Sequence, residues 1–184
     1  MVSMTEKKYH HLVYGSLEDC LTGEELLDTD DERIRQFLSR MMLEEKGYLP
    51  EQLSPRVSVE TFFANLFVRS SIELVVSSAG RDFLIIRYGP GSLVSRERAA
   101  IAAARVLNDQ YRIPLAMVTN GKEAELLDTI TGKVLGDGLD SIPDAVLAER
   151  LVPDLTYLPP LKNKQREREL RILNAFDLER CCLS

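Results

Sequence analysis

The sequence contains no tryptophan, two histidines and three cysteines among its 184 residues. Cys20 lies far from the adjacent pair Cys181 and Cys182, a spacing that matches neither a zinc site nor a disulfide framework. His10 and His11 have no third metal ligand beside them in the sequence. We therefore expect reduced thiols and no structural zinc site.

Long apolar runs and an excess of positive charge are also missing. No apolar stretch approaches the roughly 20 residues that a membrane span requires. The polar residues 1–11 do not resemble a signal sequence, so we expect a cytoplasmic protein without membrane contact. A net charge of −6 gives no general attraction for phosphate backbones, so any nucleic-acid contact would need a local basic patch.

The composition is that of one ordinary globular domain, with 45% hydrophobic and 28% charged residues. A chain of this length holds one core and a short extension. We divide it into an N-terminal arm at 1–28, an α/β core at 29–139, and a C-terminal helical extension and tail at 140–184. The arm carries no sustained periodicity, and at most one short helix is expected there.

The first clear helix is predicted to begin after Thr29 and to end at Gly47. Thr29 and Glu32 fit a capping box, in which each side chain satisfies the other residue's backbone N–H. The apolar side chains at helical spacing form one stripe that should pack on a sheet. This stripe consists of Ile34, Phe37, Leu38, Met41 and Met42.

A strand pair and a strand–helix–strand unit follow. The apolar runs at 72–76 and 83–88 predict an antiparallel hairpin. An alanine-rich helix at 96–109, with Ser95 as the expected N-cap, leads to a buried strand at 114–119. Such a connection predicts parallel strands, so the sheet should be mixed.

Shorter elements complete the expected chain. A small hairpin is expected near 124–135, a short helix from Pro143, and a charged helix at 162–180. The basic residues of that last helix interleave with Glu167 and Glu169, which favours a solvated helix over a nucleic-acid patch. These basic residues are Lys162, Lys164, Arg166, Arg168 and Arg171.

Three motifs stand out around these elements: Glu-Arg-x-Arg-Gln at 32–36, Glu-Lys-Gly-Tyr at 45–48, and Thr-Asn-Gly at 119–121. Together with the hairpin and the alanine-rich helix, they resemble the N-terminal domain of type I restriction enzyme R subunits. That family belongs to the PD-(D/E)XK nuclease superfamily. The resemblance covers about residues 28–136. It implies a restriction-endonuclease-like α/β fold, with a mixed central sheet flanked by helices and here followed by a C-terminal helical extension.

The resemblance also implies a metal site on the hairpin. Such a nuclease needs an acid on the first strand and Glu-x-Lys on the second, because carboxylates hold the cation and the lysine supports the attacking water. Glu73 falls at the first acidic position, but the second strand has Arg87, Tyr88 and Gly89. Arginine cannot ligate Mg²⁺ and glycine supplies no amine. The motif is therefore degenerate, and we expect no catalytic residue and no cofactor.

These features favour a catalytically inactive binding or interaction module. We expect Arg87, Arg81, Arg96 and Arg98 to lie around the former cleft and to contact nucleic-acid phosphates or the carboxylates of a restriction-system protein. An ion pair between Glu73 and Arg87 across the hairpin is favoured over Glu73 as a lone metal ligand. A homodimer is a further expectation.

The sequence leaves two other functions open. One is a Mg²⁺-dependent nuclease with migrated groups, in which Glu73, Glu60 and Glu32 hold the metal. In that case Lys122 or Arg87 would replace the missing lysine. The other is a non-catalytic accessory subunit of a restriction system. The sequence alone therefore does not decide whether the chain is an enzyme; if it is one, a metal-dependent nuclease is expected. The loop at 89–92 lacks the Gly-Lys-Ser/Thr ending of a nucleotide loop, so a simple turn is favoured there.

Overall fold

The structure is a computed structural model that describes residues 13–63 and 66–182, without the side chains of 63, 66 and 176–182. The predictions for His10 and His11 lie outside the described residues, as do the side chains of Cys181 and Cys182. In the described part of the chain, none of the helices combines the length and apolarity needed to span a membrane.

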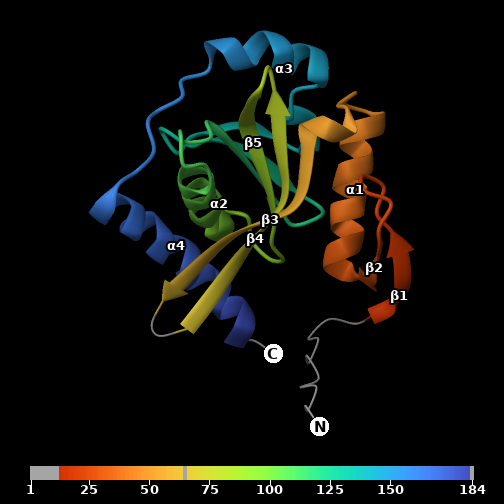
Figure 1. Cartoon of the computed structure of the whole chain (residues 1–184), viewed down its shortest axis with the longest axis horizontal. Helices are drawn as coiled ribbons and strands as arrows, with labels where there is room; N and C mark the ends of the chain where they lie inside the picture. Colours follow the sequence, from red (N-terminus) through yellow and green to blue (C-terminus); the bar gives the residue numbers. More distant parts are fainter. Residues whose placement is uncertain (1–12, 64–65, 183–184) are drawn as a thin grey trace.

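Six strands form one mixed sheet in the order β3-β4-β5-β6-β7-β8 (Figure 1). Strands β5 and β6 are parallel and every other neighbouring pair is antiparallel, which confirms the predicted hairpin and crossover. The bounds are β3 Leu53–Phe63, β4 Leu66–Ser78, β5 Arg81–Tyr88, β6 Leu115–Thr119, β7 Ala124–Asp128 and β8 Val134–Asp137.

Helices cover both faces of this sheet, so the expected mixed α/β architecture is confirmed. Figure 1 shows α1 on one side, α2 and α4 together on the other, and α3 at one end. A separate hairpin, β1–β2, lies beside α1. The bounds are β1 Val13–Glu18, β2 Glu25–Thr29, α1 Asp30–Glu44, α2 Val94–Leu107, α3 Ala145–Leu151 and α4 Asn163–Cys182.

The sheet separates two apolar cores. On the α1 side, Leu38 and Met42 pack with Leu74, Phe83 and Met117 of the strands, all nearly inaccessible to water. On the other side, the alanines of α2 are buried against the sheet and Leu173 of α4 joins them. Small alanine side chains allow a helix to pack closely on a sheet, which explains why α2 is buried along most of its length.

The structure differs from the sequence predictions at four places. Residues 13–29 form a strand hairpin, so the short helix expected within the arm is wrong for this part. The predicted strand at 72–76 is only the end of β4, which pairs along its length with β3. Ser95 is not the cap of α2, because Leu93 precedes the helix and the Ser95 hydroxyl donates to the Ser92 carbonyl at 2.8 Å. Phe37 is 52% exposed, so it lies outside the buried stripe of α1.

The turn after β6 requires glycine at position 121. Gly121 has a φ of +86°, and a Cβ atom there would lie 3.3 Å from Cδ1 of Ile34. Gly80, in the turn between β4 and β5, has a φ of +72° but open space around it. We expect Gly80→Ala to lower the free energy of unfolding by about 1 kcal/mol, through backbone strain alone. Gly121→Ala should lower it by about 1 kcal/mol more than Gly80→Ala does, because its new methyl group also meets Ile34. Urea denaturation measures both, and equal losses would contradict the close contact with α1.

Candidate functional site

The β4–β5 hairpin buries two residues of opposite charge. Leu74 pairs with Ile86 in the antiparallel register of β4 and β5. Glu73 and Arg87, the next residues on the two strands, therefore lie opposite each other. Glu73 is 3% exposed and Arg87 is 5% exposed. The Tyr88 backbone N–H donates to Glu73 Oε2 at 2.7 Å, and Arg87 Nε donates to the Ser71 carbonyl at 3.1 Å. The guanidinium of Arg87 therefore belongs to the interior of the fold rather than to an open binding surface.

Arg96 fills the space beside Gly89. A Cβ atom at position 89 would lie 3.2 Å from Cδ and 3.3 Å from Nε of Arg96. The Gly89 backbone N–H donates to the Thr119 carbonyl at 3.0 Å, and Nη2 of Arg96 lies 3.5 Å from the Pro90 carbonyl. A long side chain at position 89 would therefore have to displace Arg96.

Glu32 at the start of α1 is a buried carboxylate held by arginines. It forms an ion pair with Arg35 on the same helix, and Oε1 lies 3.5 Å from Nη1 of Arg56 on β3. Gln36 Nε2 also donates to Oε1, at 3.0 Å. Thr29 Oγ1 accepts the Glu32 backbone N–H at 3.2 Å, so the predicted N-cap is confirmed. The other half of the predicted capping box is wrong for the described residues, because the Glu32 side chain is engaged with Arg35, Arg56 and Gln36 and not with the Thr29 backbone N–H.

Arg56 connects Glu32 to the β1–β2 hairpin. It pairs with Asp19, which is 1% exposed, and lies 3.8 Å from Glu24. Its φ of +53° is unusual for a residue with a side chain, and this backbone conformation costs free energy that the surrounding structure must offset. Burial alone would raise the pKa of Asp19, but the Leu21 N–H and Arg56 outweigh it, and that pKa lies below its usual value.

The structure does not bring the alternative metal ligands together. Glu60 is exposed and accepts from Nε of Arg69 at 2.9 Å. Arg56 is the β3 residue whose side chain reaches Glu32. Glu60 lies four residues further along β3, or about 13 Å from Arg56 at the usual rise of a strand. Lys122 is exposed in the turn after β6. Within residues 13–63 and 66–182, no group of three or more acidic, histidine or cysteine side chains is placed to hold a metal ion.

The four arginines predicted to bind a ligand do not form one patch. Arg81 begins β5 and Arg87 lies six residues along it, a separation of about 20 Å at the usual rise of a strand. The Arg81 guanidinium lies over the ring of Tyr157, 4.9 Å from the ring centre. Arg96 is half-buried against Gly89, whereas Arg81 on β5 and Arg98 on α2 are exposed.

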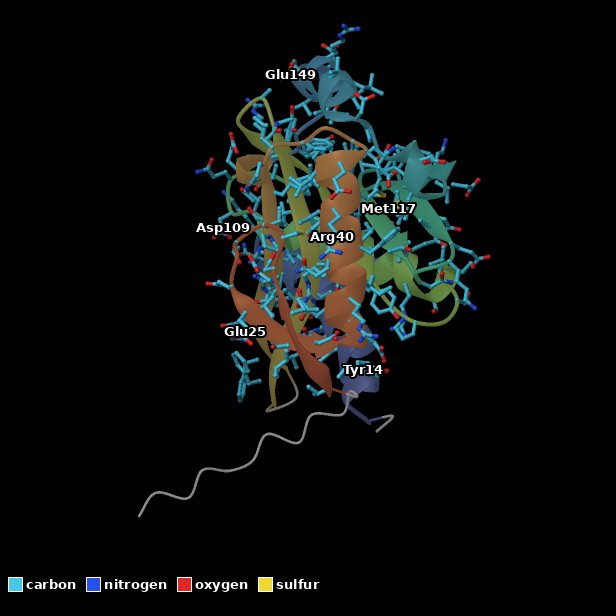
Figure 2. All side chains as sticks on the ribbon, turned by 90° about the vertical axis from the view of Figure 1, so that its right-hand side faces the viewer. Tyr14, Glu25, Arg40, Asp109, Met117 and Glu149 are labelled. Carbon is cyan, nitrogen blue, oxygen red and sulfur yellow. The ribbon has the colours of Figure 1, made fainter. Side chains whose placement is uncertain are left out.

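Sequence reasoning missed the partners of Glu32. Arg35 and Gln36 belong to the Glu-Arg-x-Arg-Gln motif, which identified them as distinctive without indicating their contacts. Asp19 and Arg56 carried no signal, because neither lies in a recognisable motif or near Glu32 in the sequence. Figure 2 looks onto α1 and shows Tyr14 of the β1–β2 hairpin near one end of that helix, where the Arg33 guanidinium lies 4.1 Å from the centre of its ring.

A family profile described as the N terminus of the type I restriction enzyme R protein (HSDR_N) matches residues 30–143, more than half of the chain. The chain belongs to this family. The HSDR_N match begins at the first residue of α1 and includes the whole six-stranded sheet and α2. Hairpin β1–β2 and helix α4 lie outside it. Comparison with curated proteins and with solved structures gave no match.

The lowered pKa of Asp19 predicts a pH-dependent contribution to stability. A carboxyl group whose pKa is lower in the folded state stabilises the fold above its usual pKa of about 3.9 and loses this effect as the pH falls. Asp19→Asn should therefore lower the free energy of unfolding most near pH 7, and the difference from the unaltered chain should shrink below about pH 4. Denaturation at several pH values measures this, with the exposed Asp154→Asn as control. A difference that stays constant with pH would contradict the role of the Asp19 carboxylate.

Proposed function

We propose that this member of the HSDR_N family is a binding module of a restriction system that does not cleave nucleic acid. The observation that carries the proposal is the burial of Arg87 next to the position of Glu73. In the nuclease motif that the family resemblance implies, position 87 belongs to a metal-binding glutamate. A buried guanidinium there changes the sign of the charge at the centre of the site.

The residues around the hairpin do not fit a magnesium ion. Mg²⁺ takes oxygen ligands in octahedral geometry, whereas a guanidinium offers only N–H donors. At Gly89, the position of the missing lysine, Arg96 lies against the backbone. Glu32, the acid on the first helix, is held by Arg35 and Arg56. We infer that arginines of the chain neutralise carboxylates that a nuclease would use for its metal.

Membership of the family supports a partner within a restriction system, either nucleic acid or a protein subunit. Burial of Arg87 argues that the hairpin is not the contact surface. The exposed Arg98 on α2 is the best placed of the four predicted arginines for such a contact. A homodimer and a role as accessory subunit both agree with this proposal.

A nuclease with migrated residues is the competing function, and a cleavage assay separates the two. The chain is incubated with Mg²⁺ or Mn²⁺ and with single- or double-stranded DNA and RNA, beside Glu73→Ala. We expect no metal-dependent cleavage by either protein. Cleavage by the unaltered chain that disappears in Glu73→Ala would overturn the proposal. Metal-dependent cleavage that persists in Glu73→Ala and stays with the chain through further purification would also overturn the proposal, whereas cleavage that separates from the chain belongs to a contaminant.

A further inference from the structure

Three arginines meet in a pocket where α2 ends and α4 begins. The pocket holds about 200 Å³ and is lined by Arg105, Arg112 and Arg168, with Gln165 and Glu169. Figure 1 shows α2 and α4 side by side, with the segment that follows α3 running to the start of α4. Helix α2 has 14 residues and a length of about 21 Å, so this pocket lies at the far end of α2 from the β4–β5 hairpin site.

Arg105 forms the fixed floor of the pocket. Its Nε donates to the Thr129 carbonyl at 2.7 Å, and Nη1 donates to Glu169 Oε1 at 3.0 Å. Its Nη2 lies 3.3 Å from the Ile130 carbonyl. Glu169 is 8% exposed, and its carboxylate forms an ion pair with Arg105. The single negative charge in the lining thus balances only one of the three arginines.

Arg112 is anchored but not neutralised. Its backbone N–H donates to the Leu158 carbonyl at 2.9 Å, and its Nε donates to the Pro159 carbonyl at 3.0 Å. Burial and the neighbouring charge of Arg105 lower the pKa of Arg112, whereas Glu169 opposes this effect. Among the described residues neither Arg112 nor the exposed Arg168 has an ion pair with a carboxylate. The pocket therefore concentrates positive charge on a chain whose net charge is −6.

We propose that this pocket binds a phosphate group through Arg105, Arg112 and Arg168. Guanidinium groups bind phosphate oxygens with paired, charge-assisted hydrogen bonds, and Arg112 has both terminal nitrogens available among the described residues. The pocket has room for about seven water molecules at ~30 Å³ each, below the ~300 Å³ of a site for a drug-sized ligand. This volume suits one phosphate group rather than a whole nucleotide. The inference does not rest on the absence of nuclease activity.

Titration with inorganic phosphate tests the site, with chloride at equal ionic strength as the reference. We expect saturable binding by calorimetry and a matching rise in melting temperature. Arg112→Gln and Arg168→Gln should each weaken binding at least tenfold. Arg150→Gln, on the exposed side of α3, removes the same charge elsewhere and should leave binding unchanged. Because Arg168 is exposed, its variant should fold even if Arg112→Gln does not.

Two outcomes would overturn the proposal: no saturable phosphate binding, or binding that is equal in Arg168→Gln and in the unaltered chain. Competition then identifies the source of the phosphate. A short DNA strand with a 5′-phosphate that displaces inorganic phosphate better than the same strand without it indicates a nucleic-acid end. Equal displacement by both strands indicates backbone phosphates, and displacement by neither indicates a small phosphorylated compound. Each of these three results supports the site only if Arg168→Gln also weakens phosphate binding at least tenfold.

Discussion

A carboxylate that is removed from water must be protonated or must lie beside a cation, because the cost of an isolated buried charge is several kcal/mol. Asp19, Glu32 and Glu73 are almost inaccessible to water, and arginines of the chain lie beside them. Arg56 reaches both Asp19 and Glu32, and so joins the β1–β2 hairpin, the edge strand β3 and helix α1. This arrangement fixes α1 against the sheet.

Local patterns predicted most of the core. The apolar spacing of α1, the Thr29 cap and the strand–helix–strand unit around α2 depend on residues close in the sequence. The structure confirms them except for Phe37, which lies outside the buried stripe of α1. The β1–β2 hairpin and the continuous pairing of β3 with β4 were not predictable in this way. Both depend on pairing with strands whose register the sequence does not reveal. Likewise, Arg56 meets Glu32 only because β3 runs past the start of α1, and it adopts a backbone conformation that no propensity favours.

The two ends of α2 differ in how positive charge is used. At the hairpin end, Arg87 is buried beside the position of Glu73, and Arg96 lies against Gly89. At the opposite end, Arg112 and Arg168 face a pocket whose only carboxylate already pairs with Arg105. An arginine inside the fold stabilises a buried acid, whereas one lining an open pocket is available to a ligand. The proposed ligand-binding site is therefore the junction of α2 and α4 rather than the hairpin.

In the proposed function, Arg87 supplies the positive charge that a metal would otherwise bring to Glu73. The most direct measurement is the stability of Arg87→Glu with and without Mg²⁺, beside the exposed Arg98→Glu as a control for charge reversal. Two neighbouring buried carboxylates repel, so Arg87→Glu should lose about 3 kcal/mol or more in EDTA. Mg²⁺ should restore part of this loss, up to about 2.7 kcal/mol at a hundred times its Kd. The unaltered chain and Arg98→Glu should show no such gain. A Mg²⁺-dependent gain in the unaltered chain, or none in Arg87→Glu, would contradict the claim.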